Sequence, residues 1–193
     1  MIKIGFIFLI YIKMFAFTDL EIAEAIKKVA FEENINPKIL YTIVKIESNF
    51  NPKIISMLLE KDEVNKIITL NRKNKFKVSF YDYALNSNKK IVNILAYNKD
   101  DLVILTQILK ENNFSFDVGL AQINSYNFSI SEVEQVVSLE GNLRKATQIL
   151  KSCIVAKKDI ENAIECYNYG LKPRKKNIYF ARFKKSFIKD FGV

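Results

Sequence analysis

Apolar residues recur at helical spacing between residues 22 and 30. Thr18-Asp19-Leu20-Glu21 has the form of a capping box, with a hydroxyl at the cap and a carboxylate three residues later. The positions behind it that fall on one helical face are Ile22, Ala23, Ile26, Val29 and Ala30. This pattern predicts a helix that starts near residue 19 and packs one face into a core.

A second helix is predicted directly after the first. Asn36 is a favourable N-cap, and Pro37 suits the first helical position. Apolar residues then recur at helical spacing, with Glu47 near the end of the same helix. The helix must stop near Phe50, because the backbone before a proline disfavours the helical region and Asn51-Pro52 follows.

The hydrophobic pattern changes between residues 54 and 113. Three segments are rich in β-prone residues and are separated by polar turns: 67–70, 76–83 and 91–97. They predict a small antiparallel meander. Helical spacing returns from Leu102 to Leu109, with Asp100 or Asp101 as the expected cap.

Three further helices are expected towards the C-terminus, at about 131–138, 142–155 and 159–168. Ser131-x-x-Glu134 and Asp159 are the expected caps. The last segment, 172–193, is strongly basic and carries scattered aromatic residues. The sequence shows no internal repeat and no low-complexity linker, so 18–193 is interpreted as a single domain with a β-bearing insert at 54–113.

The N-terminus is typical of an export signal. Lys3 precedes an apolar run from Ile4 to Ile12, which is the length of a signal-peptide core and too short to span a bilayer comfortably. Lys13 and the lack of a small-x-small cleavage site leave a retained anchor as the alternative. We therefore expect residues 1–17 to be a signal peptide or an N-terminal anchor, and the protein to be periplasmic, membrane-associated if the segment is not cleaved.

Composition narrows the chemistry more than the charge does. The net charge of +9 suits any polyanion but equally reflects a biased composition, and the basic residues form no nucleic-acid-binding motif, so no nucleic-acid partner is predicted. The chain has no His and only two Cys. This excludes Ser-His and Cys-His pairs and a thiolate zinc site, so no metal and no cofactor are predicted. Any catalysis must use carboxylates, amides and hydroxyls.

Glu47 is the candidate acid. It lies in the last turn of an apolar helix, where unpaired carbonyl groups carry partial negative charge. That field and desolvation both raise a carboxyl pKa, and a carboxylic acid that is still protonated near neutral pH can protonate a glycosidic oxygen. From this segment alone, a surface glutamate that ends a helix explains the pattern as well.

Two later motifs add groups that suit a sugar ligand. Gly119-Leu120-Ala121-Gln122-Ile123-Asn124 combines a permissive glycine with two amides, and Cys166-Tyr167-Asn168-Tyr169-Gly170 combines aromatic rings with an amide. Tyrosine offers a sugar both a stacking face and a hydroxyl, while Gln and Asn hydrogen bond hydroxyl and N-acetyl groups. Each motif alone fits an ordinary core or loop.

Together, Glu47-Ser48-x-Phe50-Asn51-Pro52, Gly119-Leu120-x-Gln122 and Tyr167-Asn168-x-Gly170 resemble the three signature motifs of the soluble lytic transglycosylase family. The resemblance covers roughly residues 20–185. It implies a mainly α (α+β) fold: a lysozyme-like helical domain with a small antiparallel β-bearing insert. The long spacing between the first two motifs, and the segment 113–125, resemble the branch associated with type IV secretion and conjugation systems.

The resemblance implies that Glu47 acts as the single catalytic acid and base on peptidoglycan. It would cleave the bond between N-acetylmuramic acid and N-acetylglucosamine and form a 1,6-anhydromuramyl product, assisted by the substrate's own N-acetyl group. The residues expected to bind substrate are Ser48, Gln122, Asn124, Tyr167, Asn168 and Tyr179. Ala121 and Tyr169 depart from the usual family pattern, where Met and a small residue are common.

Two alternatives remain at this point. A muramidase-type hydrolase would need a second carboxylate, and Asp117 is the only candidate next to a motif, interpreted here as structural. A non-catalytic wall-binding assembly factor of a secretion system is the other. The expected partners are peptidoglycan glycan strands and components of a secretion or conjugation channel, and the protein is expected to be a monomer.

The two cysteines favour a disulfide. Cys153 and Cys166 lie symmetrically about the expected turn at residues 158–160 between two antiparallel helices, and facing positions of such a hairpin come within bonding distance. An oxidising compartment favours the bond, with two buried free thiols as the alternative.

Overall fold

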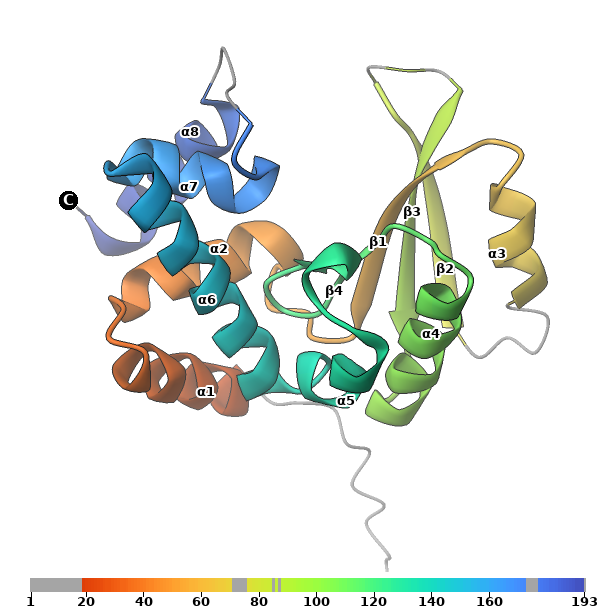
Figure 1. Cartoon of the computed structure of the whole chain (residues 1–193), viewed down its shortest axis with the longest axis horizontal. Coiled ribbons are helices and arrows are strands. Elements are labelled where there is room, and N and C mark those ends of the chain that lie inside the picture. The colour runs from red at the N-terminus through yellow and green to blue at the C-terminus, as the bar shows by residue number, and fades with distance from the viewer. Residues whose placement is uncertain (1–18, 71–75, 85, 87, 173–176, 193) are drawn as a thin grey trace, which may run out of the picture.

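The computed structural model describes residues 19–70, 76–84, 86, 88–172 and 177–192. The expected export segment at 1–17, the Thr18 cap and residues 173–176 of the basic segment lie outside these residues. The chain forms a helical part and a sheet part that lie side by side (Figure 1). One continuous hydrophobic core links the two parts, from Ile22 in the first helix to Ile94 in the sheet and Phe183 near the C-terminus.

Five helices build the helical part: α1 (Asp19–Glu32), α2 (Pro37–Ser48), α6 (Leu139–Lys157), α7 (Ile160–Tyr169) and α8 (Ile178–Phe191). The N-cap of α2 is Asn36, whose side chain accepts a hydrogen bond from the Lys38 amide, with Pro37 at the first position. Asn49 ends the helix in the left-handed conformation. The predicted first and second helices are confirmed, as is Asp159 as the cap of α7.

The sheet has the strand order β2-β3-β1-β4-β5, and every neighbouring pair is antiparallel. Its strands are β1 (Ile54–Glu60), β2 (Phe76–Asp82), β3 (Lys89–Ala96), β4 (Asp117–Val118) and β5 (Ile123–Asn124). The predicted strands at 76–83 and 91–97 correspond to β2 and β3. The sequence pattern missed β1, which occupies the centre of the sheet, so the meander is larger than expected.

The predicted strand at 67–70 is wrong, because this segment is the helix α3 (Val64–Leu70). A short run of apolar residues does not distinguish a strand from a turn or two of helix by its period. In the fold, Ile67 is buried in the core while Ile68 points away and is half exposed, as expected for a short amphipathic helix. Helices α3 and α4 (Lys99–Glu111) cover the same face of the sheet (Figure 1).

Two expected caps are also wrong. Asn98 caps α4 through a bond from the Asp101 amide, so the helix begins before the predicted Asp100 or Asp101 cap. The capping box expected at residues 131 and 134 is instead Ser129 with Glu132, two positions earlier. In both cases a neighbouring side chain of equal capping ability satisfies the free amides first.

Short elements connect the sheet to α6: the 3-10 turns η1 (Ser125–Asn127) and η2 (Ile130–Glu132), and α5 (Val133–Val136). The first of the three predicted C-terminal helices thus corresponds to η2 and α5, and α6 starts at Leu139, earlier than the expected residue 142. No helix in the described part of the chain is both long and apolar enough to cross a membrane.

Candidate active site

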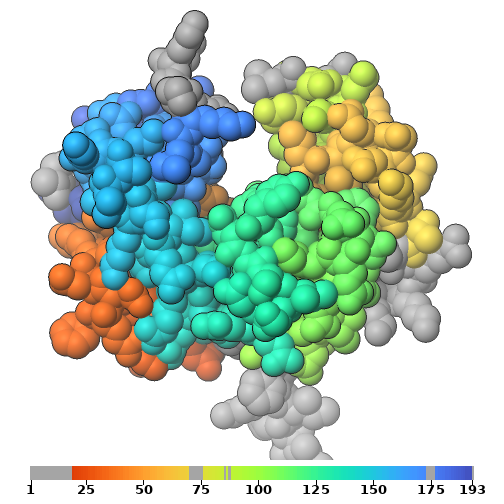
Figure 2. Space-filling model, viewed as in Figure 1, coloured from red at the N-terminus to blue at the C-terminus, as the bar shows by residue number. Residues whose placement is uncertain are grey.

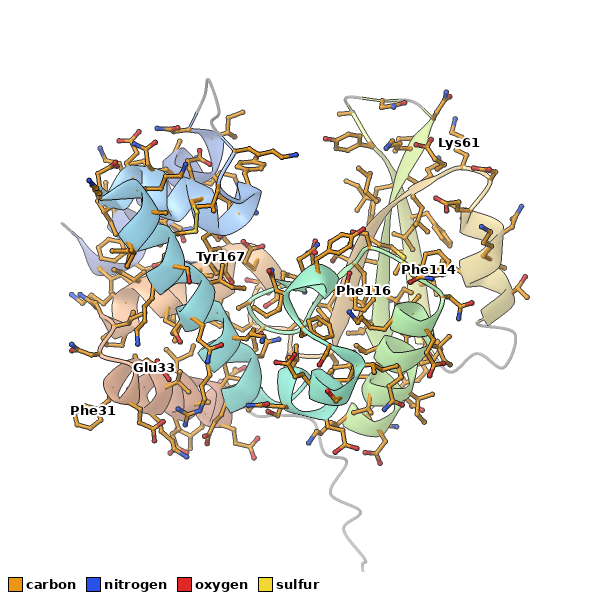
Figure 3. The ribbon with its side chains drawn as sticks, viewed as in Figure 1. Phe31, Glu33, Lys61, Phe114, Phe116 and Tyr167 are labelled. Atoms are coloured by element: carbon orange, nitrogen blue, oxygen red, sulfur yellow. A yellow bond between two sulfur atoms is a disulfide. The ribbon has the colours of Figure 1, made fainter. Side chains whose placement is uncertain are left out.

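A cleft of about 680 Å³ lies between the helical part and the sheet part. The space-filling view shows the molecule hollowed between the C-terminal helices and the sheet (Figure 2). Tyr167 lies on the helical side of this hollow, and Phe114 and Phe116 lie on the sheet side (Figure 3). Tyr179, one of the residues expected to bind substrate, does not line the cleft. The candidate carboxyl and substrate-binding residues that do line it are Glu47, Asp117, Gln122, Asn124, Tyr167 and Asn168.

Glu47 occupies the last turn of α2 and reaches the cleft wall. The Tyr179 hydroxyl donates a hydrogen bond to its Oε1 atom. The pKa of Glu47 is raised to about 7, mainly because the carboxyl is buried. The hydrogen bond from Tyr179 lowers this pKa, and the negative charge of Asp117 raises it further. The carboxyl is therefore part protonated at neutral pH, as a glycosidic acid requires. Desolvation, one of the two causes expected from the sequence, has the largest effect on this pKa.

Tyr179 is held in place from two directions. Its ring is buried and stacks against Tyr167 with centroids 6.5 Å apart. Its backbone amide donates to Glu165 Oε1 at 2.8 Å, and the next amide, of Phe180, donates to the same atom at 3.3 Å. Glu165 thus caps the N-terminus of α8, which carries no cap of its own at Asn177. Burial raises the pKa values of both tyrosines, so they stay neutral donors.

Glu165 was not found by sequence reasoning. It is buried on α7, and its Oε2 atom has no hydrogen-bond partner in the described part of the chain. An acidic residue one position before the Cys166–Gly170 motif was the only available signal. Its partners lie 14 and 15 residues away on another helix, so no local pattern connects them.

The loop at residues 119–122 is shaped by one buried asparagine. Asn142 accepts a hydrogen bond from the Ala121 amide at 2.8 Å and donates to the carbonyls of Val118 at 3.0 Å and Val136 at 2.9 Å. Gly119 has φ of +81°, and a Cβ atom there would lie 2.3 Å from Asn142 Nδ2. The glycine is therefore required both for its backbone and for the close approach of Asn142. A buried polar residue near the start of α6 was the missed signal.

The Gln122 side chain of the second motif forms hydrogen bonds within the protein. Gln122, in the left-handed region at φ 46°, donates through Nε2 to Gly119 O at 2.8 Å and to Ile54 O at 3.4 Å. Tyr167 donates to Ala121 O at 2.7 Å and so ties α7 to this loop. Ala121, one of the two departures from the family pattern, is fully buried within this loop.

Asp117 has both a structural bond and a place in the cleft. Its Oδ1 atom accepts a hydrogen bond from Asn124 Nδ2 at 2.8 Å, which supports the structural interpretation. It also lines the cleft, and burial raises its pKa. Asn124 also lines the cleft, and its side-chain Oδ1 atom accepts a hydrogen bond from the Tyr126 amide.

The structure does not bring Ser48 to the cleft. Its side chain is buried, and its hydroxyl donates to Val44 O at 3.3 Å, one turn back along α2. Tyr169, the other departure from the family pattern, does line the cleft next to Gly170 and Leu171. The bulky ring therefore adds aromatic surface at the end of α7.

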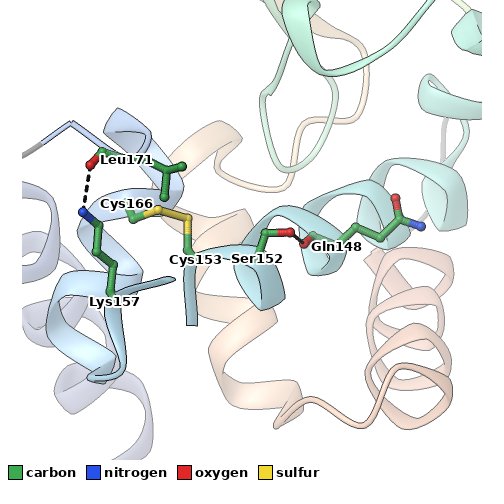
Figure 4. Close-up of a disulfide and its surroundings, with 6 residues drawn as sticks. All are labelled: Gln148, Ser152, Cys153, Lys157, Cys166 and Leu171. Atoms are coloured by element: carbon green, nitrogen blue, oxygen red, sulfur yellow. Dashed lines mark hydrogen bonds between the residues drawn. A yellow bond between two sulfur atoms is a disulfide. The ribbon is translucent and has the colours of Figure 1, made fainter. Parts of the chain in front are cut away.

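The predicted disulfide is confirmed. Cys153 of α6 and Cys166 of α7 are bonded, with Cα atoms 5.7 Å apart (Figure 4). Both cysteines line the cleft, and their bond joins the two helices that carry them. Within the described ranges, no group of three or more His, Cys, Asp or Glu residues is placed to hold a metal ion.

The comparisons with known proteins agree with this site. The family model "Transglycosylase SLT domain" matches residues 24–188, a span that includes Glu47, the 119–124 loop, Tyr167 and Tyr179. No curated protein and no solved structure matches significantly. The matched region covers most of the chain and all three motifs. The protein therefore belongs to the SLT transglycosylase family of lysozyme-like, peptidoglycan-cleaving enzymes, the lytic transglycosylases.

Proposed function

We propose that the enzyme cleaves the β-1,4 bond between N-acetylmuramic acid and N-acetylglucosamine and releases a 1,6-anhydromuramyl product. The observation that carries the proposal is a carboxyl with a pKa raised to about 7, held by a tyrosine hydroxyl at the wall of an open cleft. Such a group can give a proton at the start of a reaction and take one back at the end.

In the first step, Glu47 transfers its proton to the bridging oxygen as the bond from this oxygen to the muramyl C1 breaks. The carbonyl oxygen of the substrate's N-acetyl group attacks C1 and takes over the positive charge. In the second step, the Glu47 carboxylate removes the proton of the muramyl C6 hydroxyl, whose oxygen attacks C1 and displaces the N-acetyl oxygen. Glu47 ends protonated, and no water is consumed.

The other cleft residues are proposed to hold the sugars. Gln122, Asn124 and Asn168 offer amide groups for hydroxyl and N-acetyl contacts. Tyr167 and Tyr179 keep the loop and the carboxyl in place through their hydroxyls. Ser48 is proposed to act only indirectly, because its hydroxyl donates to the backbone of α2, the helix that carries Glu47.

Muramidase-type hydrolysis is the second candidate, and Asp117 is the observation that favours it. Its carboxyl lines the same cleft and raises the pKa of Glu47 by its charge. Inverting and retaining hydrolases both need a second carboxylate across the scissile bond. Against this, Asp117 is held by a hydrogen bond from Asn124 Nδ2 to its Oδ1 atom, so one of its two carboxyl oxygens is already engaged within the protein.

Mass spectrometry of a peptidoglycan digest distinguishes the two reactions. A transglycosylase yields anhydromuropeptides that are one water lighter than the products of a hydrolase and cannot be reduced with borohydride. We expect only the anhydro products from purified protein. Products with reducing ends would assign the protein to the hydrolases, and intact wall with retained binding would indicate an assembly factor without turnover.

We further propose that the enzyme is exported to the periplasm and opens the wall for a secretion or conjugation channel. The support is the sequence resemblance to that branch of the family, including the long separation between Glu47 and Gly119. Replacing the chromosomal copy with Glu47→Gln should lower secretion or conjugative transfer without slowing growth. Fractionation with N-terminal sequencing tests whether residues 1–17 are removed. Light scattering tests whether the protein is a monomer, as expected. Cross-linking to components of the channel tests whether they are its partners.

A further inference from the structure

The sheet has one covered face and one open face. Helices α3 and α4 lie against the first (Figure 1), where Ile55, Met57 and Val92 are almost fully buried. The other face looks across the hollow to the helical part (Figure 2). Because side chains alternate between faces along a strand, the residues between these buried positions belong to the open face.

A row of polar residues crosses the open face through all five strands. Ser79 of β2 pairs with Asn93 of β3, which pairs with Ser56 of β1. Ser56 pairs with Asp117 of β4, which pairs with Asn124 of β5. Directly opposed residues of antiparallel strands share a face, so these five side chains form one continuous line, called here the polar row. Its Asp117 end lines the catalytic cleft.

The far end of the polar row has unused hydrogen-bonding groups. The side chains of Ser56, Ser79 and Asn93 are half-buried, and none of them bonds another residue in the described part of the chain. Asp117 and Asn124, in contrast, are bonded to one another. Half-buried donors and acceptors without a protein partner, on a face that none of the described helices covers, are available to a ligand.

A second row lies alongside the first. Two residues further along the strands, Leu58 of β1 pairs with Ile91 of β3, which pairs with Tyr81 of β2. Tyr81 is 55% exposed and Leu58 is 43% exposed. This apolar row gives the open face an aromatic ring and aliphatic surface next to the polar row, the combination that suits the hydroxyl edges and apolar faces of sugar rings.

We propose that the open face of the sheet binds the glycan strand where it continues beyond the cleft, with the polar row contacting its hydroxyl and N-acetyl groups and Tyr81 stacking on a sugar ring. The inference rests on the proposed function for the identity of the ligand. Five strands at a spacing of about 4.8 Å give the polar row a length of about 19 Å, more than a single sugar occupies. The residues 54–113 insert would thereby extend the substrate site.

The charges favour a glycan over other polymers. Neither row contains a basic residue, which a nucleic acid or an acidic wall peptide would require. Lys77, the exposed lysine two positions before Ser79 on this face, lies outside both rows. At the end of the face, Lys89 is paired with Glu60 at 3.1 Å, so its charge is compensated. Neutral amide and hydroxyl groups beside an aromatic ring match the uncharged part of an N-acetylated glycan.

The test measures binding in the Glu47→Gln variant, so that the ligand is not consumed. The probes are soluble GlcNAc–MurNAc oligomers without stem peptides, one short enough to fill only the cleft and one several disaccharides longer. This variant is the parent for all further substitutions. The second variant adds Ser56→Ala and Asn93→Ala to the parent, and the third adds only Tyr81→Ala to the parent. Ile104→Ala is the control, because Ile104 is 47% exposed on α4, behind the covered face.

We expect the long oligomer to bind the parent more tightly than the short one, and the Ser56/Asn93 variant to lose about tenfold in affinity for the long oligomer only, as two lost hydrogen bonds predict. Tyr81→Ala should lose roughly fivefold in the same selective way. Equal length dependence in all variants would overturn the inference, as would an equal loss for the short oligomer. The parent's affinity for the short oligomer tests the cleft separately, and the product of the active enzyme tests the proposed reaction.

Discussion

The two walls of the cleft use polar groups in different ways. On the helical wall, the Tyr179 hydroxyl donates to the Glu47 carboxyl and the Tyr179 ring stacks on Tyr167, and desolvation raises the pKa of all three groups. On the sheet wall, the side chains of Ser56 and Asn93 are half-buried and have no hydrogen-bond partner among the described residues. The first arrangement changes the acidity of a group, whereas the second leaves groups free to recognise a ligand.

This difference reflects the elements themselves. Helix ends concentrate unpaired backbone groups at one point, so side chains from α2, α7 and α8 converge on a small, desolvated volume. A sheet instead spreads its side chains over a flat face at regular spacing. A lytic enzyme that acts on a polymer needs both a point of chemistry and an extended surface, and the following substitutions separate the two contributions.

The largest effect is expected for Glu47→Gln. It removes the only proposed acid, so release of anhydro product should fall at least a thousandfold, the upper range for a general acid. The folded pKa of about 7 lies above the unfolded value of 4.5, so the wild type loses stability as pH rises between these values. The variant should therefore gain roughly 1–3 kcal/mol relative to wild type at pH 8, measured by chemical unfolding. Retained activity would place the chemistry outside the helical wall.

Tyr179→Phe is expected to lower activity about tenfold and to move its pH profile. The hydroxyl bond lowers the pKa of Glu47, so its loss raises that pKa further above its ordinary range. Because the first step needs the protonated acid, the alkaline limb of the pH–rate profile should move to higher pH. Tyr97→Phe is the control, since Tyr97 is exposed outside the cleft. An unmoved alkaline limb would contradict the assigned role of this bond.

Asp117→Asn should produce the opposite shift with a smaller loss, about threefold at pH 8. The negative charge of Asp117 raises the pKa of Glu47, so its removal lowers that pKa and moves the alkaline limb to lower pH. The new amide still offers an oxygen to Asn124. A loss of a thousandfold at every pH would instead make Asp117 a second catalytic carboxylate and favour the hydrolase.

The smallest effect is expected for Glu165→Ala. Loss of the cap on α8 should cost about 1 kcal/mol in the free energy of unfolding and lower activity about twofold, because the Tyr179 backbone loses its acceptor. Glu165→Gln keeps a carbonyl oxygen and should restore most of the activity. If Glu165 positions Tyr179, the alanine variant should also shift the alkaline limb in the same direction as Tyr179→Phe. A loss of stability with an unchanged pH profile would limit Glu165 to a structural role.

The sequence predicted best where the signal and its partner lie close together. Asn36 and Pro37 mark the start of α2 because a cap bonds an amide two residues away. The strand predicted at 67–70 failed because that short apolar run is compatible with either period. The cap at Asn98 was missed because Asp100 and Asp101 nearby have a similar capping ability.

The sequence predicted residues that line the cleft, but it did not predict the buried residues that hold them in place. The three motifs identified the cleft residues Glu47, Gln122 and Tyr167. Asn142 and Glu165 escaped because the groups they bond are up to 24 and 15 residues away, on other elements. The polar row was likewise hidden, since it depends on strand register and on β1, which no pattern had revealed.

The sequence by itself determined that this protein has a carboxyl at a helix end, amides and aromatic rings in two later motifs, and a pair of cysteines in a helical hairpin. These follow from residue type and local spacing. Only the tertiary structure decided that Glu47 is desolvated against Tyr179, that Glu165 supports that tyrosine, and that one face of the sheet stays open beside the cleft. Desolvation and exposure depend on which distant segments pack together, and packing is a property of the whole fold.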